Sequence, residues 1–453
     1  MKIFLGLTEV SGYYSHLKKG FDELGVYAVH VPLQAHRFRY DEAVPFHFFL
    51  KWARYCVTKR VSLRNPNAIQ KLVWFTSVAL TRLMLFGWAV ITFDVFILGG
   101  GSSFFSFREL PLLRLLGKKV IYTFFGTDAR PAYLDGFFTP DQIGSGWPPP
   151  GAANGPCAGN DEARRRIMAE AQLAATIRRK AAVRAAERYA NAVICGPSFA
   201  QFMTRDFINF FVVGIPLNID TPATAEIRAS ARRPRILHAP SQSEGKGTAV
   251  IRRAIANLEQ KGLDLDYVEI SGRSNEEVID EIRRCDFVID QVYSDTPMAG
   301  FATEAAFHCK PAIVGSYYSD QIKVQMREEL IPPSLFCHPD ALERSIATLA
   351  SDIDFRRELG ERAAVFVSSK WRAKEVAARY LRLIRGDIPE TWKFSVRQVS
   401  YVHGVGLSED RMKSYVQSLI SLYGVKSLQL ADNPELEQRL VALACQESAR
   451  HAR

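Results

Sequence analysis

The sequence predicts an α/β protein made of two successive domains, each built from alternating strands and helices. Short apolar runs rich in strand-forming residues alternate with amphipathic helical stretches up to about position 385, an order typical of parallel sheets. The alternation stops at a polar linker over residues 218–234 and then starts again with a second set of similar size. The 453 residues are about three times a typical domain, so more than one core is expected.

Residues 1–215 are predicted to form the first domain, because short apolar runs there are separated by turns and by helical spacing of apolar residues. We expect strands at residues 2–7, 27–33, 93–101, 118–126, 191–198 and 209–218. We expect helices at residues 16–25, 110–117 and 163–188. Residues 135–161 are dense in Gly and Pro, so they are expected to form a long surface loop or lid inserted into this domain.

Residues 216–385 are predicted to form the second domain, with the same alternation of strands and helices. We expect its strands at residues 235–241, 264–272, 286–293 and 310–316. We expect its helices at residues 247–262, 275–284 and 301–309. Residues 386–453 form a mostly helical extension to which the pattern assigns no role. Two stacked α/β domains facing a central cleft follow from this organisation.

The composition is that of a folded soluble protein, with 47% hydrophobic and 23% charged residues. Intrinsic disorder, collagen and disulfide-scaffold classes are excluded. The seven cysteines are widely spaced without a CxxC pair, and the nine histidines show no HxxxH or HxH spacing. We therefore expect no metal site, no disulfide framework and a reducing cytosol. The first apolar run, IFLGL, is too short for a secretory signal and reads as a buried strand.

The net charge of +10 predicts an anionic partner. The excess is uneven: residues 36–82 hold nine Lys/Arg against two acidic residues, and residues 161–188 hold eight Lys/Arg against four. Either stretch can be a solvated face, a membrane-surface patch, or a surface that steers a phosphate-bearing substrate. Nucleic acid is the partner least favoured, because no zinc finger, RRM or basic zipper accompanies the charge.

The most apolar stretch, residues 72–107, is interrupted by Arg82 and Asp94. These charges leave uncharged runs of 10, 11 and 13 residues. A membrane span needs roughly 18 or more uncharged apolar residues, so we expect no span here.

The loop after the strand at 235–241 carries the first candidate site. The segment HAPSQSEGKGT offers Ser241 and Lys246 immediately before a helix N-terminus. In open parallel sheets ligands lie beyond the carboxyl ends of the strands. A hydroxyl, an ammonium and unpaired helix N–H groups together suit a diphosphate. The alternative is a plain turn with a surface lysine.

The loop after the strand at 286–293 carries the second candidate site. It contains Asp295 and Gly300, and a helix is expected to start near Phe301 with Glu304 in its first turn. The helix dipole would keep that carboxylate ionised, and it could accept hydrogen bonds from two vicinal hydroxyls such as those of a ribose. The alternative is an acidic residue that only complements the dipole.

Two loops of the first domain add weaker candidates. Gly12 follows the first strand and precedes a helix, so a phosphate could approach the backbone closely there. Thr127 and Asp128 follow the strand at 118–126, where an ordinary turn with an Asx contact is the alternative.

Taken together, these segments resemble a known enzyme family. HAPS followed by KGT, then DFVIDQ and GFATEAAFHCKPAIV, resembles the donor half of retaining GT-B glycosyltransferases of family 4. FDVFILGGGSSFF followed by LPLLRLLGKKVIYTFFGTDAR is similar to the first half of bacterial members. The resemblance covers roughly residues 1–385 and implies the GT-B fold, in which two Rossmann-like domains face a cleft.

The resemblance implies a nucleotide-diphosphate sugar as co-substrate, with no cofactor and no bound metal. Lys246 would neutralise the diphosphate, and Glu304 would accept hydrogen bonds from the donor ribose. The donor-binding residues implied in this way are Gly12, Ser241, Lys246, Gly272, Gly300, Phe301, Ala302, Thr303 and Glu304. The catalytic residues implied are Lys246, Glu304 and Asp295. Thr127 and Asp128 would lie on the acceptor side.

The chain departs from the family pattern at three positions. The glutamate usual eight positions before the ribose glutamate is Thr296, with Asp295 beside it. The arginine usual five positions before the lysine is Ser241, and the first-domain histidine is Phe125. These changes leave the identity of the donor open.

The function expected from the sequence is that of a cytosolic glycosyltransferase. It would transfer a sugar with retention from a UDP- or GDP-linked donor to a glycan or lipid-linked acceptor, in surface polysaccharide biosynthesis. The basic, aromatic-rich residues 36–60 suggest peripheral contact with the inner face of the membrane, an ordinary helical region being the alternative. Other hypotheses are an inverting GT-B transferase, a nucleotide-sugar epimerase, or a non-catalytic glycan- or partner-binding scaffold.

Overall fold

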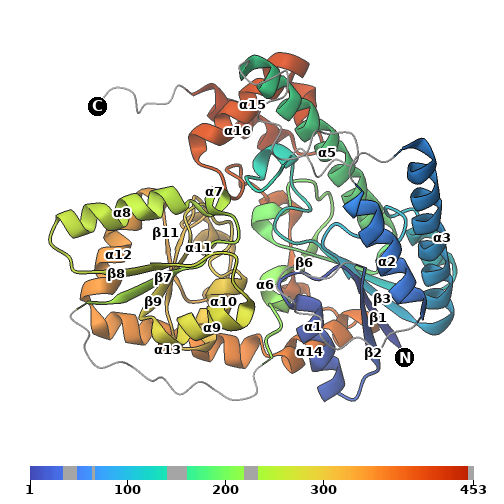
Figure 1. Cartoon of the computed structure of the whole chain (residues 1–453), viewed down its shortest axis with the longest axis horizontal. Helices are drawn as coiled ribbons and strands as arrows, with labels where there is room; N and C mark the ends of the chain where they lie inside the picture. Colours follow the sequence, from blue (N-terminus) through green and yellow to red (C-terminus); the bar gives the residue numbers. More distant parts are fainter. Residues whose placement is uncertain (34–47, 64–66, 140–160, 219–232, 447–453) are drawn as a thin grey trace.

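The computed structural model describes residues 1–33, 48–63, 67–139, 161–218 and 233–446. These residues form two α/β domains, each built on one largely parallel sheet (Figure 1). Most of the Gly/Pro-rich insertion and of the linker predicted between the domains lies outside the described residues, as does the first part of the basic stretch at 36–60.

The first domain holds a seven-stranded sheet in the order β12-β6-β5-β4-β3-β1-β2. Its strands are β1 (Ile3–Leu7), β2 (Ala28–Pro32), β3 (Val95–Gly99), β4 (Lys119–Thr123), β5 (Ala192–Cys195), β6 (Phe207–Asn209) and β12 (Lys393–Phe394). All neighbours are parallel except β12, which runs antiparallel to β6. The strands β1, β2 and β3 are buried throughout, as expected for a parallel sheet covered on both faces.

The second domain holds a five-stranded parallel sheet in the order β11-β10-β9-β7-β8. Its strands are β7 (Arg235–His238), β8 (Asp266–Glu269), β9 (Phe287–Gln291), β10 (Ala312–Gly315) and β11 (Leu335–Cys337). Its helices are α7 (Ser243–Lys246), α8 (Thr248–Gln260), α9 (Asn275–Arg284), α10 (Gly300–Phe307), α11 (Gln321–Gln325), α12 (Leu342–Ser351) and α13 (Ile353–Lys370).

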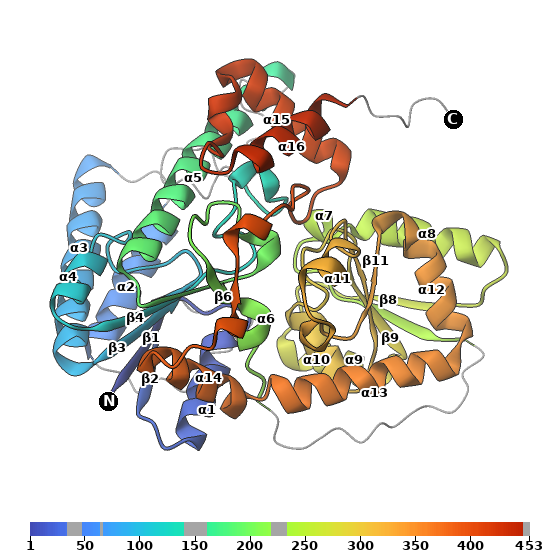
Figure 2. The same ribbon diagram turned by 180° about the vertical axis from the view of Figure 1, so that it is seen from behind.

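The remaining helices lie on the first domain or connect to it. They are α1 (Tyr13–Glu23), α2 (Phe48–Ser62), α3 (Ala68–Thr92), α4 (Leu110–Leu115), α5 (Asp161–Tyr189), α6 (Phe210–Val213), α14 (Ala373–Arg385), α15 (Glu409–Tyr423) and α16 (Pro434–Cys445). After α13 the chain returns to the first domain, where α14 packs on α1 (Figures 1 and 2). The contact is so close that a Cβ on Gly20 would lie 2.1 Å from the Ala373 carbonyl oxygen.

The C-terminal extension, whose role the sequence left open, shares the core of the first domain. β12 extends the first sheet beside β6. Met412 and Val416 of α15, together with Leu440 of α16, belong to the same buried cluster as Val183 of α5. The extension therefore completes the first domain rather than hanging free in solution.

One expectation about an element is wrong. The strand expected at 209–218 is replaced by β6, which ends at Asn209, and by the helical turn α6. The Asn209 side chain accepts the Phe211 N–H at 3.0 Å, which caps a helix at that point. Residues 68–92 form the single helix α3, which includes the first part of the apolar stretch 72–107 where we expect no membrane span. Among the described residues it is the one helix long and apolar enough to cross a membrane, because a single arginine does not end a helix.

Candidate functional site

A cavity of about 210 Å³ lies at the carboxyl ends of β7, β8 and β9, where it also reaches the first domain. The described residues that line it are Ser11, Ala239, Pro240, Ser241, Lys246, Ile270, Ser271, Gly272, Arg273, Asn275, Val278, Ala299, Gly300, Phe301 and Glu304. Ligands of open parallel sheets bind at this edge. Of the donor residues expected from the sequence, the structure brings Ser241, Lys246, Gly272, Gly300, Phe301 and Glu304 to one place.

Lys246 is held in this cavity by a buried carboxylate. Its Nζ donates to Asp290 Oδ1 at 2.8 Å, and the two side chains are 14% and 1% exposed. The lysine is the last residue of α7, and Gly247 adopts φ 74° so that the chain can turn directly into α8. Asp290 Oδ2 has no hydrogen-bond partner among the described residues. The ammonium therefore already neutralises one anion and has further donors for a second.

Glu304 lies in the second turn of its helix, not the first as expected. The helix α10 begins at Gly300 and has no acidic residue in its first turn. Glu304 Oε1 accepts a hydrogen bond from Asn275 Nδ2 at 2.8 Å. Desolvation of the carboxyl raises the pKa of Glu304 to about 7; the Asn275 hydrogen bond lowers this pKa and the negative charge of Asp290 raises it. Contrary to our expectation, the helix dipole does not keep this carboxyl fully ionised at neutral pH.

Three other expected donor residues do not line the cavity. Ala302 and Thr303 are buried inside the domain, and the Thr303 hydroxyl donates to the Ala299 carbonyl at 2.8 Å. Gly12 is buried at the start of α1 with φ 80°, and it is the neighbouring Ser11 that reaches the cavity. The sequence motif predicted these three residues near the site, but all three are buried and do not line the cavity.

The N-terminus of α1 is already occupied by a carboxylate of the chain itself. Glu9 accepts the N–H groups of Tyr14 and Ser15 at 3.1 and 3.0 Å, and it is only 6% exposed. The N–H groups that a phosphate would need at this helix end are therefore already bonded, which argues against the role expected for Gly12.

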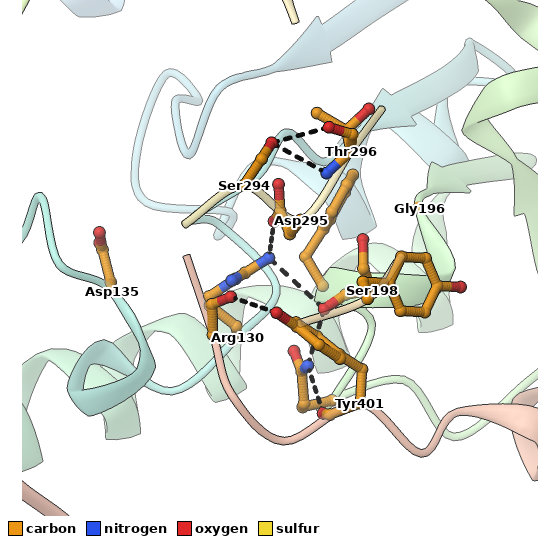
Figure 3. A network of polar contacts seen from close by, with 12 residues as sticks. Arg130, Asp135, Gly196, Ser198, Ser294, Asp295, Thr296 and Tyr401 are labelled. Atoms are coloured by element: carbon orange, nitrogen blue, oxygen red, sulfur yellow. Dashed lines mark hydrogen bonds and ion pairs between the residues drawn. The ribbon is translucent and has the colours of Figure 1, made fainter. Parts of the chain in front are cut away.

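Asp295 lies away from the cavity, in a buried ion pair between the two domains (Figure 3). Its Oδ2 accepts from Arg130 Nη2, and both side chains are almost fully buried. The same nitrogen of Arg130 lies 3.5 Å from the Ser198 carbonyl, and its guanidinium lies over the Phe199 ring at 5.8 Å. Burial raises the pKa of Asp295, while Arg130 lowers it. Asp295 thus helps to join the two domains, and the catalytic role expected for it stays a prediction.

The acceptor-side candidates belong to the same interdomain region. Asp128 Oδ2 accepts the Phe125 N–H three residues before it at 3.1 Å, so the side chain closes an ordinary turn, although not by the Asx contact considered as the alternative. Desolvation raises the pKa of Asp128 to about 6, and Arg179 and Arg130 lower it. Thr127 lies half-buried in the same turn. An acceptor role for this turn stays a prediction.

A segment of the C-terminal extension bridges the two domains beside this ion pair. The Gly406 N–H donates to the Tyr293 carbonyl of the second domain at 2.7 Å, and the Val405 N–H donates to the Leu134 carbonyl of the first at 3.0 Å. The Tyr401 carbonyl accepts from Gln201 Nε2 at 3.0 Å, as Figure 3 shows. The extension therefore helps to fix how the domains are arranged around the cavity.

Arg130 is the residue of this region that sequence reasoning missed. It follows Asp128 in the segment FFGTDAR, and nothing in its spacing distinguishes it from a surface arginine. Its partner Asp295 is 165 positions away along the chain, so the pair becomes visible only in the folded structure. Asn275, which positions the Glu304 carboxyl, was missed for the same reason.

We expect Arg130→Met to destabilise the protein by about 3–5 kcal/mol, because it leaves the Asp295 carboxylate buried without its partner. The double variant Arg130→Met/Asp295→Asn should regain part of this loss. Arg362→Met, which removes an exposed ion pair on α13, is the matched control and should change the melting temperature little. An unchanged melting temperature for Arg130→Met in differential scanning calorimetry would show that the pair does not hold the domains together.

No protein-family model matches the sequence, and no curated protein matches it. Solved structures do resemble it: a Staphylococcus aureus TarM mutant in complex with fondaparinux, alpha-GlcNAc-glycerol and UDP has a TM-score of 0.53 at 8% identity, over 85% of this chain and 100% of that one. Anabaena Alr3699/HepE in complex with UDP and glucose has a TM-score of 0.49 at 12% identity, over 85% and 100% of the two chains. At such identities the likeness concerns the fold. The chain has the GT-B fold, with two parallel-sheet α/β domains like those of the TarM structure.

Proposed function

We propose that the protein is a glycosyltransferase that takes a sugar from a nucleoside-diphosphate donor. One observation carries this proposal. Lys246 and Glu304 are far apart in the sequence, but both line one cavity at the strand ends of the second domain. The ammonium is suited to a diphosphate, and the carboxyl to the hydroxyls of a ribose. UDP in the TarM and HepE structures supports a uridine nucleotide as the first choice of donor.

In the proposed reaction the bond between the sugar C1 and the diphosphate oxygen breaks, and an acceptor hydroxyl forms the new bond to C1. Negative charge develops on the departing diphosphate, where the Lys246 ammonium stabilises it. Glu304 would hold the ribose, and so fix the position of the diphosphate relative to Lys246. The acceptor hydroxyl loses its proton as its oxygen attacks C1, and the proton passes to the departing diphosphate or to solvent.

The proposal has three further parts. The enzyme would transfer the sugar with retention, would use a glycan or lipid-linked acceptor, and would act in the cytosol in surface polysaccharide assembly. They rest on the sequence resemblance to family 4 alone. NMR of the product's anomeric configuration would separate a retaining from an inverting transferase, and isomerisation of the donor without an acceptor would indicate an epimerase.

A thermal-shift screen against UDP, GDP and ADP tests the proposed function directly. A ligand present at 100 times its Kd stabilises the native state by about 2.7 kcal/mol, so the correct nucleotide should raise the melting temperature clearly. If none of the three nucleotides, and none of their sugar conjugates, shifts the melting temperature, the protein is a non-catalytic scaffold on a GT-B fold.

Transfer should not need a divalent cation, and activity should survive EDTA. In the part of the chain that the structure describes, no group of three His, Cys, Asp or Glu side chains could hold a metal ion. The Lys246 ammonium would supply the positive charge at the diphosphate instead. Turnover measured before and after EDTA treatment checks this, and a strict requirement for Mn²⁺ or Mg²⁺ would contradict it.

A further inference from the structure

The helix α3 is apolar on two opposite faces. Val78, Leu85 and Ala89 are buried on the side that packs into the protein. The opposite side presents an outer apolar face of large side chains that are about half exposed or more. They are Ile69, Leu72, Val73, Leu80, Leu83 and Ile91, with Phe75 at one edge, at 72%, 64%, 49%, 50%, 58%, 86% and 60% exposed. Most of these residues recur every three or four positions, so they form one stripe along the helix. Single exposed apolar residues are ordinary, but a continuous stripe of this kind marks an interaction surface.

The helices that carry this outer apolar face are basic. The helices α2 and α3 contain Lys51, Arg54, Lys59, Arg60, Lys71 and Arg82, and neither helix contains an acidic residue. Lys51, Lys59, Arg60 and Lys71 are exposed, whereas Arg54 and Arg82 are half-buried against the protein. The Arg60 guanidinium lies over the Phe75 ring at 5.7 Å, and the Lys59 ammonium lies over the Tyr55 ring at the same distance. Tyr55 in turn meets Trp74 edge to face, with ring centroids 6.0 Å apart. The Arg60–Phe75 contact thus places a cation of α2 directly against a residue of the outer apolar face.

The hairpin of α2 and α3 lies on the outer rim of the first domain. Both views place α3 at the edge of the molecule that is farthest from the second domain (Figures 1 and 2). A helix of 25 residues is about 37 Å long, so the face is large enough for a broad contact. The contact surface is therefore separate from the nucleotide cavity.

We propose that the outer apolar face of α3 docks on an anionic lipid surface, with α3 lying in the membrane plane. The apolar side chains would enter the boundary between headgroups and acyl chains, while the exposed cations Lys51, Lys59, Arg60 and Lys71 would contact the headgroups. A membrane-spanning arrangement is disfavoured because Val78, Leu85 and Ala89 would have to leave the core of the first domain. A second copy of the chain is disfavoured because pairing would bring two hairpins with cations and no carboxylates face to face.

This inference extends the proposed function, because it would place the acceptor-side domain at the membrane, where lipid-linked acceptors are found. It does not depend on that function. A protein that binds no nucleotide could still dock through this face, and the two failures are distinguishable when nucleotide binding and vesicle binding are measured on the same samples.

Co-sedimentation of the full-length protein with vesicles tests the proposal. We expect binding to vesicles of phosphatidylcholine and phosphatidylglycerol in equal amounts, and at least tenfold weaker binding to phosphatidylcholine alone, at about 0.1 M salt where the Debye length is about 10 Å. Leu80→Glu/Leu83→Glu should weaken binding to the mixed vesicles at least tenfold. The matched control is Val324→Glu/Val365→Glu, which adds two carboxylates at exposed valines of the second domain and should bind nearly as well as wild type. Lys59→Gln/Arg60→Gln should reduce the preference for phosphatidylglycerol.

Four results would overturn the proposal. The face does not contact lipid if wild-type protein fails to bind the mixed vesicles. The same conclusion follows if the Leu80→Glu/Leu83→Glu variant binds them as well as wild type. A variant that instead turns a dimer into a monomer in light scattering would assign the face to self-association. Protein that stays with the membrane through an alkaline carbonate wash would indicate a spanning helix. Unchanged UDP binding and melting temperature in the variants show that they remain folded.

Discussion

Replacing Lys246 with alanine is expected to weaken nucleoside-diphosphate binding and turnover efficiency by about ten- to a hundredfold. A hydrogen bond to a charged group contributes roughly 1.5–3 kcal/mol, and the Lys246 ammonium lines the cavity beside the buried Asp290 carboxylate. The measurement is calorimetric titration of wild type and Lys246→Ala with the nucleotide selected by the thermal-shift screen.

The same substitution should also lower stability, because the structure pairs Lys246 with Asp290. Without the lysine, the Asp290 carboxylate, 1% exposed, is left buried with neither oxygen paired to a cation. We expect a loss on the order of 3 kcal/mol. The double variant Lys246→Ala/Asp290→Asn should recover most of this stability but none of the nucleotide affinity, which separates folding from binding.

The control for Lys246 is Lys261→Ala in the same domain. Lys261 pairs with Glu343 on the surface, where its side chain is 65% exposed. It should change neither nucleotide affinity nor melting temperature appreciably. If Lys246→Ala binds the nucleotide as tightly as this control, the diphosphate does not lie at Lys246.

Replacing Glu304 with glutamine should lower the affinity for the nucleoside diphosphate about tenfold at pH 8. The glutamine keeps the volume and one acceptor oxygen but loses the charge that strengthens hydrogen bonds from the ribose hydroxyls. Because the pKa of Glu304 is about 7, the wild-type carboxyl is largely protonated at pH 6. The difference in affinity between wild type and Glu304→Gln should therefore shrink as the pH falls from 8 to 6, as measured by calorimetric titration at both values.

The stability of the empty protein should respond to Glu304→Gln in the opposite sense. The folded pKa of about 7 lies above the ordinary value of 4.5, so the folded state binds the proton more tightly than the unfolded state. The resulting stabilisation is present at pH below about 4.5 and is lost as the pH rises through 7. Glu304→Gln should therefore increase the free energy of unfolding at pH 8 by on the order of 1–3 kcal/mol and raise the melting temperature there. At pH 5 it should change both quantities little. A lower melting temperature at pH 8 would mean that the ionised carboxylate stabilises the fold.

The fold was predictable because the alternation of strands and helices is repeated many times along the sequence. The α/β alternation and the order of motifs around Lys246 and Glu304 predicted two parallel-sheet domains of the GT-B type, and the structural likeness confirms that fold class. The loops at Ser241, Gly272 and Gly300 were placed at one site because parallel strands end at a common edge. Strand ends read from periodicity thus give the position of a site to within a few residues.

The electrostatics of the site could not be predicted in the same way. Whether Glu304 is ionised depends on desolvation and on Asp290 and Asn275, which adjoin it only through the fold. The pairing of Arg130 with Asp295 joins two domains and leaves no periodic trace in the sequence. The outer face of α3 was hidden for another reason: a count of uncharged runs treats Arg82 as a break, whereas the helix continues through it.

The central claim is that Glu304 binds the ribose of the donor, and its most direct test compares two nucleotides on two proteins. The nucleotide is the nucleoside diphosphate that gives the largest thermal shift. Wild type and Glu304→Gln are each titrated with that nucleotide and with its 2′,3′-dideoxy form at pH 8. If Glu304 holds the ribose, the variant should bind the natural nucleotide about tenfold more weakly than wild type does, and the two proteins should bind the dideoxy form equally, because the hydroxyls that the carboxylate would accept from are absent. Equal binding of the natural nucleotide by both proteins, or a tenfold difference that persists with the dideoxy form, would contradict the account.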